Sequence, residues 1–278
     1  MAQGTGPWVL VTGASDGIGR ETARELTRRG AQVIAHGRSE AKLAAVHAEL
    51  ASLAGAPGPA PLAGDLASLA SVRAMAAELE RRGDRPQVLL LNAGVFERTL
   101  QRTDDGFERT FAINHLAHFL LTHLVLQGAA SARLERIVVV SSMAHQRGAI
   151  RLDDPQRLKR PYDAYGTYAA SKLANVLFTV ELARRLAGRG ITVNALHPGV
   201  VSTKLLTEGF GMQGGESLAE GAATSVMLAL GPIGAQVTGR YFSHQREAPI
   251  NPAANDRELA RRFYALSAEL VGVAPLPA

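Results

Sequence analysis

The chain has 278 residues, and 30 Lys and Arg against 25 Asp and Glu give it a formal net charge of +5. It contains no cysteine, which excludes disulfides, cysteine nucleophiles, thiolate zinc sites and iron–sulfur clusters. The length suits one large α/β domain spanning residues 1–278.

Arginine pairs account for much of the basic excess. They fall in the segments 28–30, 81–83 and 184–190, each shortly before a glycine and after an amphipathic run. Cations at the end of a helix oppose the negative end of its dipole, and glycine supplies the left-handed cap. We therefore interpret the pairs as helix ends and expect no nucleic-acid partner.

Residues 110–132 carry no formal charge and are numerous enough to cross a bilayer. Several polar side chains interrupt the stretch, which would make a membrane span costly. A buried helix or a subunit interface is the better interpretation. The polar residues that interrupt the stretch are Asn114, His115, His118, Thr122, His123 and Gln127.

Residues 1–7 lack the basic start and apolar core of a signal peptide, so we expect a cytoplasmic protein without a membrane anchor.

Short β-branched or leucine-rich runs alternate with longer helical ones, which predicts a doubly wound parallel sheet of about seven strands with helices on both faces, a Rossmann-type α/β fold. Two segments fit neither pattern, and we expect them to form loops over a site, near 143–166 and 202–225. The predicted strands are 8–12, 32–36, 61–63, 88–91, 136–140, 192–196 and 240–242. The predicted helices are 17–29, 40–54, 68–82, 106–131, 165–187 and 255–271.

A glycine-rich turn, 12–19, directly follows the first predicted strand and opens a helix. Gly13 permits the tight turn, Gly17 and Gly19 allow close approach of backbone and helix, and the free N–H groups of the helix start suit a pyrophosphate. A strand-to-helix turn without a ligand is the alternative. Asp16 places a negative charge beside this turn, which opposes phosphate binding.

The end of the second strand reads His36-Gly37-Arg38-Ser39, with no acid before Glu40. Folds that bind NAD usually place an acid there for the ribose hydroxyls, whereas the guanidinium of Arg38 suits a 2′-phosphate. NADP is therefore favoured over NAD. A solvated arginine at a helix start remains the alternative.

Tyr168 and Lys172 are four residues apart on a predicted helix, so both can point into one pocket. Lowering a phenol pKa from about 10 to 7 requires roughly 4 kcal/mol. A cation about 4 Å away supplies about 1 kcal/mol in water and about 4 at an effective dielectric near 20. The pair must therefore be partly buried to be catalytic, and an exposed pair on a solvated face is the alternative.

These motifs together resemble the short-chain dehydrogenase/reductase family, and specifically its retinol-dehydrogenase-like branch. The resemblance covers nearly the whole chain in the family's order, which implies an oxidoreductase that interconverts an alcohol and a carbonyl group by hydride transfer with NADP or NAD. It rests on the segments 12–19, 92–94, 114–119, 140–142, 168–178, 197–201, 239–242, 255–256 and 270–272.

The resemblance also implies residue roles. Tyr168 would be the general acid or base, Lys172 would lower its pKa and bind the nicotinamide ribose, Ser142 rather than Ser141 would polarise the substrate oxygen, and Asn114 would hold a relay water. The expected cofactor-binding residues are Gly13, Ser15, Asp16, Gly17, Ile18, Gly19, Arg38, Asp65, Leu66, Asn92, Ala93, Gly94, Tyr168, Lys172, Pro198, Gly199, Val201 and Thr203. We expect no metal site.

Two departures and one alternative complete the interpretation. Leu91 stands where the family commonly has a second asparagine, and Ser142 and Tyr168 are farther apart than usual. Many animal members of the branch carry an N-terminal membrane anchor. We expect none here, so a membrane-embedded retinoid is a doubtful substrate. The resemblance implies a homodimer or homotetramer. A non-catalytic dinucleotide-binding regulator or scaffold with the same fold is the alternative function.

Overall fold

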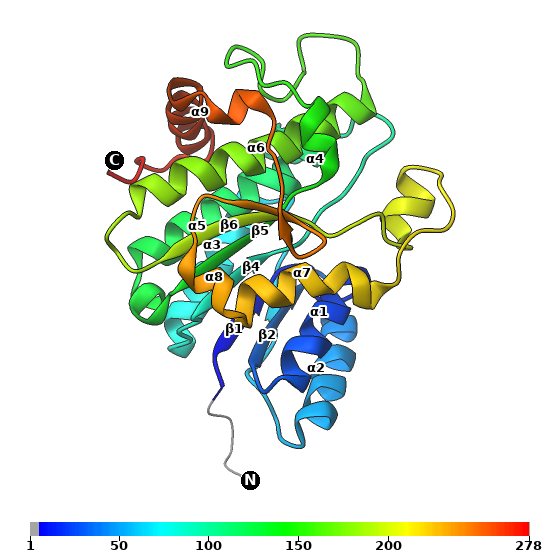
Figure 1. The fold of residues 1–278 in the computed structure, drawn as a ribbon, viewed down its shortest axis with the longest axis vertical. Coiled ribbons are helices and arrows are strands. Elements are labelled where there is room, and N and C mark those ends of the chain that lie inside the picture. Colours follow the sequence, from blue (N-terminus) through cyan, green and yellow to red (C-terminus); the bar gives the residue numbers. More distant parts are fainter. Residues whose placement is uncertain (1–5, 278) are drawn as a thin grey trace.

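The computed structural model describes residues 6–277. Its centre is one sheet in the order β3-β2-β1-β4-β5-β6-β7-β8 (Figure 1). All neighbours are parallel except β7 and β8, which are antiparallel. The strands are β1 Trp8–Val11, β2 Gln32–Gly37, β3 Leu62–Ala63, β4 Val88–Leu91, β5 Arg136–Val140, β6 Thr192–His197, β7 Tyr241–Ser243 and β8 Arg246–Glu247.

Helices cover both faces of this sheet, as predicted (Figure 1). Helices α1, α2, α7 and α8 lie on one side, and α3, α5, α6 and α9 lie on the other. The helices are α1 Gly17–Arg28, α2 Glu40–Ala54, α3 Leu69–Arg82, α4 Arg109–Phe111, α5 Ala117–Gln127, α6 Ala164–Arg185, α7 Leu218–Leu230, α8 Pro232–Gln236 and α9 Arg257–Leu270.

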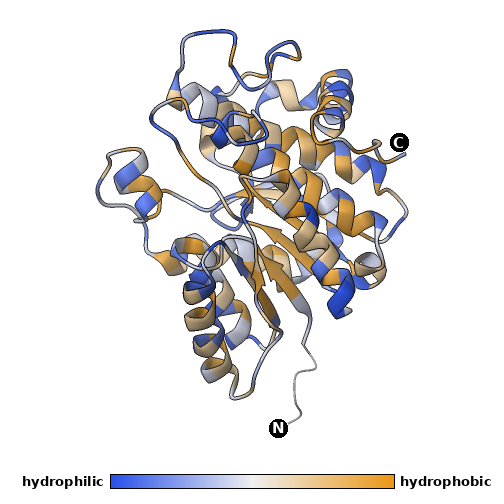
Figure 2. Cartoon of the chain, turned by 180° about the vertical axis from the view of Figure 1, so that it is seen from behind, coloured by the Kyte–Doolittle hydropathy of each residue, from blue (hydrophilic) through white to orange (hydrophobic). Residues whose placement is uncertain are grey.

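The core has two layers, one on each side of the sheet, because successive strand side chains point to opposite faces. In β1, Val9 and Val11 pack toward α1 and α7, whereas Leu10 packs toward the opposite layer. Strand side chains point to opposite faces in turn, so a sheet covered on both sides needs apolar residues at every position. Figure 2 shows hydrophobic strands, in orange, at the centre and hydrophilic residues, in blue, along the surrounding helices and loops.

The prediction missed three elements. Strand β8 has only two residues, and neither is buried. Helices α7 and α8 were not predicted, so the predicted loop 202–225 is too long: α7 begins at Leu218, with a capping box between Ser217 and Glu220. Its mixture of small and apolar residues has weak amphipathic periodicity because one side packs on α1 and much of the rest is also buried.

The long helix predicted over 106–131 is interrupted. Helix α4 continues into a π-helix, Ala112–Leu116, before α5, and a short 3-10 helix follows at Ala129–Arg133. The predicted loop 143–166 also contains a 3-10 helix, Met143–Arg147, and ends at Ala164 where α6 begins.

The uncharged stretch 110–132 is buried within the chain itself. Helix α9 and the following tail cover it: His115 contacts Ser267, His123 contacts the carbonyl of Ala274, and Phe119 packs edge-on against Tyr264. A second subunit is therefore not needed to explain its apolar character. Within residues 6–277, no helix has the length and apolar character that crossing a membrane requires.

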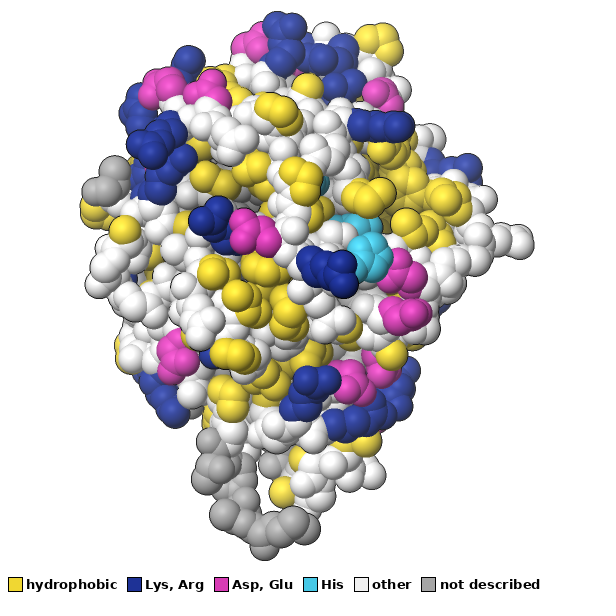
Figure 3. Space-filling view, in the orientation of Figure 1, with side chains coloured by type: hydrophobic (Ala, Val, Ile, Leu, Met, Phe, Trp, Pro, Cys, Tyr) yellow, Lys and Arg dark blue, Asp and Glu magenta, His cyan; other side chains and the backbone are white. Residues whose placement is uncertain are grey.

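Charged side chains are interspersed on the face drawn in Figure 3, where basic and acidic groups lie among apolar and uncharged ones. Many arginines lie in ion pairs along helices, such as Arg81 with Glu78 and Arg261 with Glu258. Arg81 and Arg82 occupy the last turn of α3, and Gly83 is its left-handed cap, as predicted.

Candidate active site

The glycine-rich turn joins β1 to α1 at the carboxyl edge of the sheet. Gly13 and Gly17 have φ angles of 68° and 54°, a region that glycine adopts without strain. A Cβ on Gly19 would lie 2.2 Å from the carbonyl oxygen of Gly13, so only glycine fits there. Asp16 caps α1, because its Oδ1 accepts from the backbone N of Gly17 at 2.9 Å.

His36 holds this turn in place, a role that the sequence did not reveal. Its Nδ1 accepts a hydrogen bond from the backbone N of Gly13 at 3.2 Å, so Nε2 carries the proton and donates to the carbonyl of Gly64 at 3.2 Å. Burial lowers the pKa of His36 to about 4, which keeps the ring neutral. Arg38 is exposed just beyond the end of β2.

The segments after β3 and β4 lie along the same edge of the sheet. After β3, Asp65 Oδ1 accepts from the backbone N of Ala67 at 2.9 Å, and Leu66 is buried. After β4, Asn92 Nδ2 donates to the carbonyl of Thr12 at 2.8 Å, and the Thr12 hydroxyl accepts from the backbone N of Asn92 and of Ala93. The end of β4 is therefore well hydrogen-bonded without the second asparagine that the family commonly has.

Asn114 lies in the π-helix and is fully buried. Its Oδ1 accepts from the backbone N of Val95 at 2.8 Å, while its Nδ2 donates to the Val95 carbonyl and to Ser171 Oγ, each at 3.0 Å. Only one lone pair of Oδ1 remains for the expected relay water. A Cβ on Gly94 would be 3.3 Å from both Asn114 Oδ1 and Lys172 Nζ, so these groups meet beside Gly94.

The two serines after β5 have different environments. Ser141 Oγ donates to the carbonyl of Lys172 at 2.7 Å and is buried. Ser142 begins a 3-10 helix, and its hydroxyl lies close enough to Tyr168 to oppose the rise in that phenol's pKa. Of the two hydroxyls, that of Ser142 therefore lies beside the phenol, whereas that of Ser141 is bonded to the backbone of α6.

Tyr168 and Lys172 are both buried on α6, as a catalytic pair requires. Lys172 Nζ lies 5.6 Å from the centre of the Tyr168 ring and donates to the Val140 carbonyl at 3.2 Å. Burial raises the pKa of Tyr168 to about 12 and lowers the pKa of Lys172 to about 8. The predicted lowering of the phenol pKa is thus not produced by this geometry, because desolvation outweighs the opposing hydrogen bond with Ser142.

A cavity of about 210 Å³ connects the predicted residues from distant parts of the chain. Ile18 of the glycine turn, Ser142 and Tyr168 all line it, together with Pro198, Gly199, Val201 and Thr203 after β6. Gly199 has a φ of 99°, and a Cβ there would collide with the Glu216 carboxylate.

Aromatic side chains that the sequence analysis did not single out cover the tyrosine. The ring centre of Phe210 is 5.2 Å from that of Tyr168 and 4.2 Å from that of Phe96, and Phe96 lies 5.5 Å from Tyr168. Phe210 belongs to a glycine-rich segment with no regular apolar pattern, so no local signal marked it.

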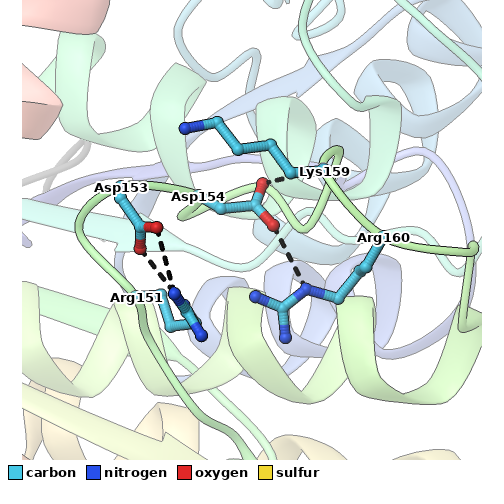
Figure 4. Close-up of a pocket in the computed structure, with 5 residues that line it drawn as sticks. All are labelled: Arg151, Asp153, Asp154, Lys159 and Arg160. Atoms are coloured by element: carbon cyan, nitrogen blue, oxygen red, sulfur yellow. Dashed lines mark hydrogen bonds and ion pairs between the residues drawn. The ribbon is translucent and has the colours of Figure 1, made fainter.

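A second cavity, of about 260 Å³, lies in the loop between β5 and α6 (Figure 4). Arg151 pairs with Asp153, and Arg160 pairs with the buried Asp154, both at 3.1 Å. Asp154 also accepts from the backbone N of Lys159 at 3.2 Å, and the side chain of Lys159 extends away from Asp154. These interactions organise the loop, and none of the predicted site residues lines this cavity.

Comparisons with known proteins agree with this arrangement. A family model described as enoyl-(acyl carrier protein) reductase matches residues 13–234. Retinol dehydrogenase 14 of Mus musculus is 42% identical, over 96% of this chain and 86% of its own length. Retinol dehydrogenase 12 of Bos taurus is 39% identical, over 96% of this chain and 87% of its own. The chain belongs to the short-chain dehydrogenase/reductase family.

Solved structures support the same assignment. An uncharacterised protein from Mycobacterium paratuberculosis is 34% identical, with a TM-score of 0.81 over 98% of this chain and 95% of its own. A short-chain dehydrogenase from Escherichia coli CFT073, complexed with NADPH, is 26% identical, with a TM-score of 0.69 over 86% of this chain and 97% of its own. The predicted fold class is thus confirmed.

This retinol-dehydrogenase-like member of the family is an oxidoreductase acting on CH–OH groups with NAD or NADP. Its residues fit such a cofactor: α1 begins at Gly17 inside the glycine-rich turn, and the turn packs so closely on itself that a side chain at Gly19 would collide with the Gly13 carbonyl. Ser15 lies in the same turn, and its hydroxyl would be 3.0 Å from a Cβ on Gly37 at the end of β2. The glycine-rich turn and the end of β2 are therefore in close contact.

Proposed function

We propose that this chain is an NADP(H)-dependent oxidoreductase that interconverts an alcohol and an aldehyde or ketone of moderately apolar character. The observation that carries the proposal is the shared cavity: Ile18 of the phosphate-binding turn and Tyr168 of the catalytic helix line one space of about 210 Å³. A substrate in this space would lie beside both the cofactor site and a buried phenol.

Tyr168 is proposed to act as the general acid in reduction and the base in oxidation. A phenol whose pKa is about 12 keeps its proton at neutral pH, so it can donate to a developing alkoxide. The bound cofactor donates or accepts the hydride. In oxidation the phenol must lose its proton, which the charge of Lys172 favours once that group is protonated.

Ser142 is proposed to hold the substrate oxygen in place. Its position beside Tyr168 gives that oxygen two hydroxyl neighbours, which polarise a carbonyl as negative charge develops on it. Lys172 is proposed to bind the nicotinamide ribose, and Asn114 to hold a relay water beside Lys172, where the two side chains meet at Gly94.

Arg38 supports a preference for NADP. It is exposed at the end of β2, and the next acidic residue, Glu40, already lies in α2. Among residues 6–277 its guanidinium has no ion-pair partner. A guanidinium in that position suits a 2′-phosphate, whereas residues 36–39 offer no carboxylate for the ribose hydroxyls. Replacing Arg38 with alanine should reduce the affinity ratio for NADPH over NADH about ten-fold or more. An unchanged ratio contradicts the preference.

The substrate is proposed to be apolar because the cavity walls are. Leu205, Leu206, Phe210 and Met212 form one side, and Met143 with Tyr165 lies near the catalytic serine. The names of the retinol dehydrogenase relatives are consistent with an apolar alcohol. A test panel should therefore pair retinal with shorter apolar aldehydes and with polar ones.

Tyr168→Phe tests the function against the alternative of a non-catalytic scaffold. Wild type should oxidise or reduce members of an alcohol, aldehyde and ketone panel, followed by the absorbance of reduced nicotinamide. The variant should lose activity by at least about 100-fold while still binding NADPH, because only the proton donor is removed. A wild type that binds NADPH but turns over nothing in the panel supports the scaffold instead.

A further inference from the structure

Residues 202–216 form a loop whose two ends lie side by side. The backbone N of Ser202 donates to the carbonyl of Glu216 at 3.1 Å, and the backbone N of Glu216 donates to the carbonyl of Val200 at 2.7 Å. In Figure 1 this segment, drawn in yellow, stands out from the body of the molecule before α7. Its ends are fixed, and its position over the site depends on contacts made farther along it.

One such contact joins the segment to the glycine turn. Lys204 Nζ lies 2.7 Å from Oδ2 of Asp16, a residue 188 positions away along the chain. The other oxygen of Asp16 caps α1, which fixes the direction of the carboxylate. The neighbouring Thr203 methyl would be 3.7 Å from a Cβ on Gly17, so the segment lies directly on the turn.

The same segment also reaches the catalytic tyrosine. The carbonyl of Thr203 accepts from the backbone N of Leu206 and of Thr207, which starts a helical turn right after the ion pair. Six residues beyond Lys204, Phe210 packs edge-on against Tyr168. The ion pair at one end and the aromatic contact at the other thus span both halves of the proposed site.

We propose that the Asp16–Lys204 ion pair is a clasp that holds residues 203–210 over the dinucleotide site and slows release of the bound cofactor. The inference rests on the proposed function for the identity of that cofactor. Both side chains are more than half exposed, so the pair contributes little to folding. Its effect lies in joining two segments that must separate before a dinucleotide can leave.

The clasp also explains the acid beside a phosphate-binding turn. An unpaired carboxylate at Asp16 would repel the pyrophosphate. The Lys204 ammonium neutralises it, and hydrogen bonding to Lys204 is the main reason that the pKa of Asp16 is lowered. Lys204 is thereby a positioning residue, acting on the cofactor through the segment that it anchors.

The test is the rate of NADPH release, measured by stopped-flow displacement of the fluorescent cofactor with excess NADP. Lys204→Met and Asp16→Asn should each release NADPH about two- to five-fold faster, the range expected for one exposed ion pair. Asparagine keeps the helix cap, so α1 is preserved in the second variant. Lys204→Arg, which keeps the pair, should release NADPH at the wild-type rate.

The double variant Asp16→Asn/Lys204→Met separates a clasp from two independent effects. It should release NADPH no faster than either single variant, since each already breaks the same contact. Lys159→Met, which removes an exposed lysine from the distant charged loop, is the matched control and should not change the rate.

Three outcomes overturn the clasp: unchanged release in Lys204→Met, slower release in Asp16→Asn, or fully additive effects in the double variant. Slower release in Asp16→Asn would mean that the carboxylate only repels the cofactor. Wild type that fails to bind NADPH refutes the proposed function itself, whereas normal binding with unchanged rates refutes the clasp alone.

Discussion

The ring nitrogen Nδ1 of His36 accepts a hydrogen bond from the backbone N of Gly13, the first glycine of the turn 12–19, at 3.2 Å. Because only a neutral ring can accept there, the shape of the turn depends on His36 staying unprotonated. Burial lowers the pKa of His36 to about 4, against about 6.5 for an exposed histidine.

Acid should therefore destabilise the protein in a defined window. The unfolded chain binds a proton at His36 below about pH 6.5, whereas the folded chain does so only near pH 4. The stability due to the neutral ring is complete above pH 6.5 and is lost as the pH falls toward 4. Urea unfolding of wild type and His36→Asn, whose Oδ1 can still accept from Gly13, measures this contribution. The variant should have a shallower slope, by up to about 1.4 kcal/mol per pH unit, and identical slopes contradict the assignment.

Lys172 should reduce the stability of the free protein. Burial lowers its pKa to about 8. At pH 7 the ammonium is therefore charged but desolvated in the folded state, which costs free energy, whereas water solvates it in the unfolded state. Lys172→Met should raise the free energy of unfolding at pH 7 by roughly 1–3 kcal/mol while abolishing turnover. For wild type this contribution to stability recovers as the pH rises from about 8 toward 10.5. A Lys172→Met variant less stable than wild type at pH 7 would show that the bond to the Val140 carbonyl outweighs desolvation.

Phe210 should act as a wall of the substrate site. Phe210→Ala removes an aromatic surface from the neighbourhood of Tyr168, so kcat/KM for a bulky apolar aldehyde should fall about 5- to 30-fold. A three-carbon aldehyde should be little affected, because it does not reach that wall. Leu100→Ala, at an exposed position outside the cavity lining, is the control. A higher kcat/KM for the bulky aldehyde would mean that Phe210 occupies the substrate's space.

Tyr264 should stabilise the packing of α9 against α5 and α6. It is buried, its ring centre lies 4.9 Å from that of Phe119, and the Arg185 guanidinium lies 4.3 Å from the ring. Tyr264→Ala should destabilise the chain by about 3–5 kcal/mol in urea unfolding. The exposed Arg261→Ala on the same helix should change stability by less than about 0.5 kcal/mol.

The oligomeric state can be tested with the same pair of variants. The uncharged stretch 110–132 predicts a buried helix or a subunit interface, and α9 already covers it within one chain. Light scattering of wild type therefore tests the predicted homodimer or homotetramer directly. If subunits instead associate through the face that carries α9, Arg261→Ala and Tyr264→Ala should both alter the association of subunits.

By itself, the sequence determined the alternation of strands and helices, the glycine turn and the Tyr168–Lys172 pair. These features depend on residues close together in the chain: buried parallel strands are continuous apolar runs, and side chains four apart on a helix share a face. The sequence did not predict helix α7, because the helix is buried on more than one side and its amphipathic period is therefore weak.

Only the tertiary structure decided how distant segments meet at the site. The contacts of His36 with Gly13, of Phe210 with Tyr168 and of Lys204 with Asp16 join residues from 23 to 188 positions apart, and no local pattern records them. The electrostatics likewise depend on the fold. The sequence placed a cation beside Tyr168, yet the phenol pKa rises to about 12, because burial removes the water that would stabilise its charged form.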